Sequence, residues 1–293
     1  DYGRFIDGEL RANECPLGSG ALAGSGLPID REATAIELGF DRPTRNTMDA
    51  VADRDFCVEY ASAAAMLLVH LSRACEDIAL WTSSEYGFIK LDDRASTGSS
   101  IMPQKRNPDP AELLRGKSAR VIGDLSSLLV LQKGLPYAYN RDLQEDKSIF
   151  FDIEDTLSAS LKAFVALVRA IRPQPGRMQS ALQGSFIEAT DLAEYLVSRG
   201  VPFRSAYQAA KSIISLCAQR GCAIADLDAE LIQGSHSALL GLKFDMAGLA
   251  AYLKPEACVA RRTQTGGPAP QKTQEEIARL RDFVSQEKNK GVQ

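Results

Sequence analysis

One polar stretch separates two long helical patterns: Gly98-Ser99-Ser100-Ile101-Met102-Pro103-Gln104-Lys105-Arg106-Asn107-Pro108. Its two prolines and its glycine disfavour a helix, because proline lacks the backbone N–H that an interior helical turn requires. Its hydroxyls, two amides and two cations supply the hydrogen-bond donors that suit carboxylates. Composition alone leaves two interpretations open, an anion-binding loop and a solvated connector.

The chain before this loop carries a long helical pattern. Residues 46–86 contain neither glycine nor proline, and their apolar positions alternate spacings of three and four. Such spacing is the seam of a helical bundle. The seam residues are Cys57, Tyr60, Ala64, Leu67, Leu71, Ala74, Ile78 and Trp81. With a rise of about 1.5 Å per residue, the pattern predicts a helix about 55 to 60 Å long.

Two further long helices are predicted after the loop. Asp109 as N-cap and Pro110 at the first helical position favour a helix start, and Gly134 marks its end. A third heptad stripe covers residues 146–171. Three long seams predict an all-α fold with a long-helix bundle in residues 1–172. Wide apolar stripes would remain exposed in a single chain, so we expect several chains to associate.

The helical pattern changes at Arg172-Pro173-Gln174-Pro175-Gly176. The helices predicted beyond this point are shorter, and Gly200 followed by Pro202 marks a stop and a restart between two of them. A final amphipathic helix is expected over residues 274–288. Residues 173–293 are therefore predicted to form a small C-terminal helical domain. The sequence shows no clear strand alternation.

Composition excludes several classes of function. The 293 residues carry a formal net charge of −4, which provides no broad basic surface for nucleic acid. The longest apolar run, residues 61–69, is shorter than the roughly 20 residues that span a bilayer, and no leader pattern opens the chain, so a cytoplasmic protein is expected. Six scattered cysteines and two histidines predict reduced thiols, with no metal site and no cofactor.

The order of residues in the loop is more specific than its composition. Residues 98–108 match the pattern GSSxMPxKxNP at every fixed position, and in this they resemble the aspartase/fumarase superfamily. Other stretches resemble its argininosuccinate lyase family in particular. They are residues 18–24 (GSGALAG), 46–56 (NTMDAVADRDF), 70–73 (HLSR), 134–147 (GLPYAYNRDLQEDK) and 262–267 (RTQTGG). The resemblance implies an all-helical enzyme that splits argininosuccinate into arginine and fumarate.

The resemblance also implies a set of site residues. The reaction removes a proton beside a carboxylate, and fixed positive charge must stabilise the dianion that forms. Ser99 corresponds to the catalytic serine, acting either as base or as proton donor, and the sequence leaves both roles open. Lys105 and Asn107 correspond to groups that bind the substrate carboxylate, and Glu112 to a glutamate that makes a catalytic histidine more basic. The remaining substrate-binding candidates are Tyr139, Gln144, Lys147 and Arg54.

Without the resemblance, plainer interpretations hold for several of these residues. Glu112 favours a helix N-terminus. Residues 139–147 read as a charged helix start on a solvated surface. Asp53-Arg54-Asp55 is equally well an ion-pair cluster.

Two departures from the family pattern limit the interpretation. The family's catalytic histidine belongs to segments that precede residue 1, and neither His70 nor His236 matches it. Tyr207 stands where many relatives have histidine. We therefore expect an argininosuccinate lyase that lacks its N-terminal region and is inactive alone. The resemblance implies a homotetramer whose sites are shared between subunits. Two alternatives are a catalytically silent structural protein like the delta crystallins and another superfamily lyase, such as adenylosuccinate lyase.

Overall fold

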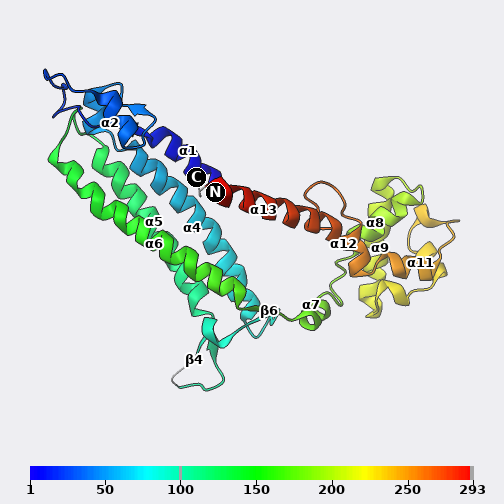
Figure 1. Ribbon diagram of the computed structural model, residues 1–293. Coiled ribbons are helices and arrows are strands. Elements are labelled where there is room, and N and C mark those ends of the chain that lie inside the picture. Colours follow the sequence, from blue (N-terminus) through cyan, green and yellow to red (C-terminus); the bar gives the residue numbers. More distant parts are fainter. Residues whose placement is uncertain (99–100, 291–293) are drawn as a thin grey trace. The chain divides into compact units, whose positions relative to one another are not determined.

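The computed structural model describes residues 1–98 and 101–290. It consists of two compact units, Asp1–Met178 and Gln179–Gln293, which are built mainly from helices (Figure 1). The predicted all-α fold with a long-helix bundle is confirmed. No helix among the described residues is both long and apolar enough to cross a membrane. The domain boundary at residue 172 stays a prediction, while the compact units divide within helix α7 (Pro175–Ala181).

Three long helices form the core of the first unit. They are α4 (Asp55–Thr82), α5 (Asp109–Gln132) and α6 (Asp146–Arg169), and they lie side by side in Figure 1. A shorter helix, α1 (Tyr2–Ala12), packs on α4. The buried residues between the long helices are Cys57, Ala61, Ala64, Ala65, Leu68, Val121, Leu128, Ile153 and Leu157. Many of those on α4 are alanines, which allow its backbone to approach α5 closely.

The single helix predicted over residues 46–86 was wrong, because the chain breaks before Arg54. Residues Thr47–Ala52 form a separate short helix, α3, and α4 begins at Asp55. At the break Asp53 is extended, and its carboxylate accepts a hydrogen bond of 2.7 Å from the Asp55 N–H. This local bond competes with helical pairing. Trp81, predicted in the seam, is instead 39% exposed in the last turn of α4.

Short strand pairs, which the sequence did not predict, fix the connections of the first unit. Strands β4 (Thr97–Gly98) and β5 (Arg106–Asn107) are antiparallel and close the base of the predicted anion-binding loop. Elsewhere β3 (Ile89–Leu91) pairs with β6 (Ile171–Pro173), and β1 (Glu14–Cys15) pairs with β2 (Arg42–Pro43). Strands of two or three residues are too short to show an alternating pattern in the sequence.

Other short elements connect these parts. Helix α2 (Arg31–Glu37) has Asp30 as its N-cap, and the Asp30 carboxylate accepts a hydrogen bond of 2.9 Å from the Ala33 N–H. Helix α5 starts one residue away from the prediction, since Pro108 occupies the N-cap position. The Asp109 carboxylate instead accepts a hydrogen bond from the Thr97 hydroxyl, so it ties α5 to β4. A 3-10 turn, η2 (Arg141–Glu145), leads into α6.

The second unit is a cluster of shorter helices around its own apolar core. Its helices are α8 (Ala189–Ser198), α9 (Phe203–Arg220), α10 (Ala229–Gly234), α11 (Met246–Tyr252), α12 (Pro255–Ala260) and α13 (Pro270–Lys290). Leu192 and Leu196 of α8 are fully buried against Ile213 of α9. Gly200 adopts φ +88°, which permits the sharp turn between these two helices. The predicted final amphipathic helix corresponds to α13.

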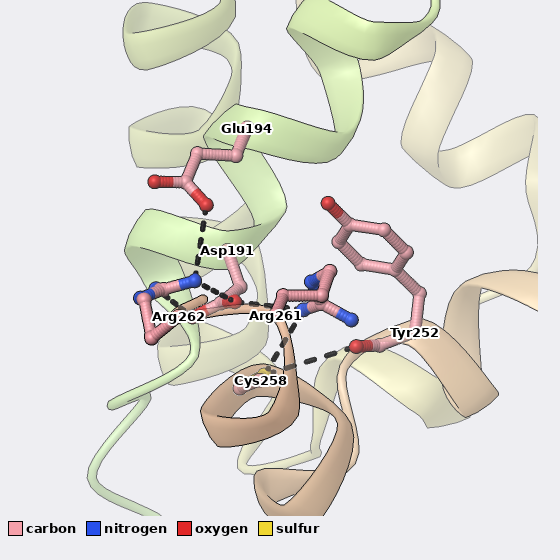
Figure 2. A network of polar contacts seen from close by, with 6 residues as sticks. All are labelled: Asp191, Glu194, Tyr252, Cys258, Arg261 and Arg262. Atoms are coloured by element: carbon pink, nitrogen blue, oxygen red, sulfur yellow. Dashed lines mark hydrogen bonds and ion pairs between the residues drawn. The ribbon is translucent and has the colours of Figure 1, made fainter. Parts of the chain in front are cut away.

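A buried carboxylate joins α8 to the end of α12 (Figure 2). Asp191 accepts one hydrogen bond of 2.7 Å from Arg261 and two, of 3.0 and 2.9 Å, from Arg262. The Arg261 guanidinium also stacks 3.5 Å from the centre of the Tyr252 ring. Burial alone raises the pKa of Asp191, but the hydrogen bonds from the two arginines outweigh it and hold the pKa below its usual value. The network holds the chain where it leaves α12.

Candidate active site

Strands β4 and β5, the base of the loop that carries the superfamily-like motif, lie at one end of the bundle, by the label β4 in Figure 1. Ser99, the predicted catalytic serine, lies outside the described residues. Asn107 is half-buried in β5 opposite Thr97. Lys105 has an exposed side chain, and its N–H donates a hydrogen bond of 3.1 Å to the Met102 carbonyl. An ion pair between Arg106 and Asp93 holds the base of the loop.

Glu112 lies at the same end of the bundle, in the first turn of α5. Its backbone N–H bonds to the Pro108 carbonyl at 3.1 Å, and its side chain is exposed. A carboxylate at this position is favourable next to the helix N-terminus. The structure therefore gathers Lys105, Asn107 and Glu112 around the start of α5.

The other candidates lie around a cavity of about 1150 Å³ beside the first turns of α4 and α6. Arg54, Tyr139 and Lys147 all line this cavity. Gln144 does not line it, but its Nε2 donates a hydrogen bond of 2.9 Å to the Tyr139 hydroxyl. Four candidates that are up to 93 residues apart in the sequence thus form one group, since Arg54 precedes α4 and the other three surround the start of α6.

The cavity wall carries charges of both signs. Besides Arg54 and Lys147, the cations Arg11 and Arg45 line it. Its carboxylates are Glu14, Asp49, Asp53, Asp55, Glu59 and Asp146. An open cavity of this composition suits a ligand that itself carries positive and negative groups.

Asp146 is a residue of this cavity that the sequence reasoning missed. Its carboxylate accepts hydrogen bonds from Arg54 Nε and, at 2.8 Å, from Lys147 Nζ. Burial works to raise the pKa of Asp146, yet the contacts with Lys147 and Arg54 dominate and lower it. The carboxylate therefore stays ionised at neutral pH. Its only signal in the sequence was its place in the family-like stretch 134–147.

The glycine-rich segment 18–26 forms another part of the wall, at Gly20 and Ala21. Arg31 holds this segment in place. The Arg31 guanidinium donates hydrogen bonds to the Leu17 carbonyl at 2.9 Å, to the Ser19 hydroxyl at 3.1 Å and to the Thr44 hydroxyl at 2.8 Å. Gly20, which lines the cavity, has φ +62°. A Cβ there would lie 2.6 Å from the Gly24 carbonyl oxygen, so only glycine fits.

Cys57 lies in the wall of the cavity as a buried, free thiol. Burial raises its pKa to about 11, so the thiol stays protonated and unreactive at neutral pH. Within residues 1–98 and 101–290, no cluster of three or more histidine, cysteine or acidic side chains is arranged to hold a metal.

The two groups of candidates are far apart in one chain. Glu112 and Gln132 lie near the two ends of α5, and a rise of 1.5 Å per residue separates them by about 30 Å. Tyr139 and Lys147 follow the far end of this helix, while Lys105 precedes its near end. The structure thus places the candidates in two separate groups and does not bring these groups together within one chain.

Two family models match the chain. Residues 2–123 match the model described as "Lyase", and residues 186–260 match "Argininosuccinate lyase C-terminal". The argininosuccinate lyase of Symbiobacterium thermophilum is 47% identical over 285 residues, which are 97% of this chain and 60% of that protein. The enzyme of Heliobacterium mobile is 46% identical, over 97% of this chain and 61% of its own length. The chain therefore spans about three fifths of these curated relatives.

Solved structures share the fold. EDDS lyase in complex with formate superposes with a TM-score of 0.85 at 29% identity, covering 98% of this chain and 58% of that one. A variant of EDDS lyase with bound fumarate gives a TM-score of 0.84 at 29% identity, with the same coverage. A class II fumarase from Schistosoma mansoni, at 15% identity and a TM-score of 0.63, covers 81% of this chain and 54% of its own and shares the fold alone.

Proposed function

This chain belongs to the argininosuccinate lyase family, and we propose that it carries two of the half-sites with which such an enzyme splits argininosuccinate into arginine and fumarate. The observation that carries the proposal is the cavity that gathers Arg54, Tyr139 and Lys147. These three residues were candidates because of the family resemblance alone, and all three line one charged cavity. The relatives named argininosuccinate lyase, and the fold shared with a fumarate-bound enzyme, support the same reaction.

In the proposed reaction, a proton leaves the carbon next to a carboxylate of the succinyl group. The electrons of that C–H bond spread onto the carboxylate and then form the C=C bond of fumarate as the C–N bond breaks. The guanidino nitrogen leaves with a proton as arginine. Lys105 and Asn107 stabilise the dianion, since an intermediate of this charge needs fixed donors. Ser99 transfers one of the two protons, and Glu112 acts through a histidine that this chain does not supply.

The cavity binds the arginine end of the substrate in this proposal. The α-carboxylate of arginine accepts hydrogen bonds from Lys147 and Arg54, for which both cations have suitable donors. Tyr139, held by Gln144, adds a polar hydroxyl. The carboxylates around the cavity suit the α-ammonium and guanidinium groups. The arginine part of the substrate, with one carboxylate and two cationic groups, thus matches the mixed charges of the cavity wall.

A complete site requires a second subunit, because about 30 Å of α5 separates the half-sites. We therefore propose a homo-oligomer in which the loop of one subunit meets the cavity of another. Large apolar side chains on the outer faces of α5 and α6 are available for such packing. Examples are Leu129, Val130, Phe151 and Val165, which are 47 to 70% exposed. Exposed apolar stripes of this kind are typical of helix-to-helix interfaces.

The test uses the completed protein, defined as this chain joined to the segment of the Symbiobacterium thermophilum relative that it does not match. We expect it to release fumarate from argininosuccinate, measured by ultraviolet absorbance, and expect its Ser99→Ala variant to be slower by about 10²-fold or more. Adenylosuccinate, aspartate and malate serve as competing substrates. Preference for any of these, or equal rates for the wild type and Ser99→Ala, contradicts the proposal. The 293 residues alone are expected to show negligible turnover.

A further inference from the structure

Asp146 occupies a buried and well-fixed position at the edge of the cavity. It is the first residue of α6, where the helix N-terminus favours a negative charge. Its side chain is only 6% exposed, whereas that of its neighbour Lys147 is 62% exposed. The carboxylate is therefore fixed by the helix, while the lysine depends on a partner for its orientation.

Each oxygen of Asp146 binds one cation of the candidate site. Oδ2 accepts a hydrogen bond from Arg54 Nε, and Oδ1 accepts one of 2.8 Å from Lys147 Nζ. A further bond of 2.6 Å runs from Arg54 Nη1 to the Asp53 carbonyl. These bonds leave part of the five N–H groups of arginine and the three of lysine for a ligand.

We propose that Asp146 is a positioning residue that orients Arg54 and Lys147 toward a single carboxylate of the ligand and neutralises one of their two charges. The inference rests on the proposed function of the cavity. A lysine side chain without a partner samples many rotamers, and ordering it on binding costs free energy. With Asp146 in place, this ordering precedes ligand binding, and the pair of cations keeps one net positive charge.

The kinetic test compares two isosteric variants of the completed protein. Asp146→Asn removes the buried charge, whereas Glu145→Gln removes an exposed carboxylate one residue away, for which no contact with Arg54 or Lys147 is seen. Because the cavity holds the part of the substrate remote from the chemistry, we expect Asp146→Asn to raise KM about tenfold with little change in kcat. Glu145→Gln should leave both constants within about twofold. Equal effects of the two variants, or a loss in kcat alone, overturn the inference.

Coupling between Asp146 and Lys147 gives a second test. If Asp146 acts through the lysine, Lys147→Gln raises KM strongly in the wild type and much less in the Asp146→Asn background. If Asp146 only stabilised the fold, the fold-changes in KM of the two single variants would multiply in the double variant. Should Asp146→Asn fail to fold, Asp146→Glu keeps the charge but displaces it by one methylene. That variant should also raise KM with kcat retained, and an unchanged KM contradicts the inference.

A spectroscopic test needs only the 293-residue chain. The Nε–H proton of Arg54, donated to a buried carboxylate, should give a shifted NMR signal that exchanges slowly with water. We expect Asp146→Asn to abolish this signal and Glu145→Gln to retain it. Retention in both variants contradicts the inference. Failure of the proposed function is recognised separately, because then the wild-type completed protein itself shows no turnover of argininosuccinate.

Discussion

Glu112 and Tyr139 lie beyond each other's reach in one chain, because the first is in the opening turn of α5 and the second follows its far end. About 30 Å of helix separates them. Tyr139 lines the charged cavity, and Glu112 lies beside the base of the loop that carries Lys105. A ligand much shorter than this helix therefore cannot contact both residues of one chain, and under the proposed function it binds where two chains meet.

This separation predicts complementation between variants with different defects. In the completed protein, Ser99→Ala disables the loop half-site, and Lys147→Ala disables the cavity half-site. Ser99→Ala should lower kcat about 10²-fold or more, and Lys147→Ala should raise KM strongly, so each pure variant is slow at a substrate concentration well below its KM. When the two are unfolded together and refolded, some sites combine an intact loop with an intact cavity. Fumarate release should then exceed that of either variant refolded alone.

The contrary outcome is equally clear. If both half-sites of every site came from one chain, mixed oligomers would contain no intact site and would gain nothing. A mixture of two loop variants, Ser99→Ala and Lys105→Ala, is the matched control, since both defects fall in the same half-site. It should remain inactive after refolding.

The buried Asp191 should be essential to the stability of the second unit. Its carboxylate binds both Arg261 and Arg262 and is 6% exposed. Asp191→Asn removes the carboxylate that pairs with Arg261 and leaves Arg262 only the exposed Glu194, and it should cost about 3 kcal/mol in the free energy of unfolding of this unit. Glu194→Gln breaks only the 3.2 Å contact of an exposed carboxylate with Arg262 and should cost at most about 1 kcal/mol.

Two probes separate the units in this experiment. The single tryptophan, Trp81, belongs to α4 and reports on the first unit. Hydrogen exchange at α8 and α9 amides reports on the second. Asp191→Asn should accelerate exchange there while the tryptophan fluorescence transition in urea stays in place. Equal exchange in both variants would show that the network adds little stability.

The same carboxylate predicts a pH dependence. Hydrogen bonds from Arg261 and Arg262 lower the folded-state pKa of Asp191 despite its burial, whereas the unfolded value is about 3.9. A lowered folded pKa means that the stabilisation is complete above the unfolded pKa and disappears as the pH falls through the folded one. The stability difference between wild type and Asp191→Asn should therefore be constant near neutral pH and shrink below about pH 4. Urea titrations across this range measure it.

The long helices could be predicted because their apolar positions repeat every three or four residues over many turns. The break at Asp53 could not, since it depends on one local hydrogen bond to the Asp55 N–H within a stretch that has helical periodicity. The strand pair β4–β5 could not be predicted either, because strands of two residues show no alternating pattern. The spacing of apolar residues therefore predicted the long helices, whereas individual hydrogen bonds determine the residues at which they begin and end.

For the candidate site, the sequence supplied candidate residues, whose roles stay predictions, but not their arrangement in space. A motif shared with a family identified Lys105 and Lys147 without saying that α5 keeps them apart. The sequence does not single out Asp146, because a carboxylate within a charged stretch is usually exposed to solvent. Its significance depends on burial and on Arg54, which lies 92 residues earlier in the chain. Only the fold shows such a contact.

The glycine-rich segment 18–26, which lines the cavity at Gly20, should tolerate substitution at Gly26 and not at Gly20. Gly20 has φ +62°, and a Cβ there would meet the Gly24 carbonyl oxygen at 2.6 Å, whereas a Cβ at Gly26 would meet nothing within 4 Å. A left-handed conformation costs an alanine about 1 to 2 kcal/mol, and the clash adds to this. Gly20→Ala should therefore destabilise the first unit by at least about 1 kcal/mol in urea unfolding followed by Trp81 fluorescence. Gly26→Ala should leave stability unchanged or slightly higher, because alanine restricts the unfolded chain. Equal stability of the two variants would mean that the segment rearranges freely and does not form a fixed wall.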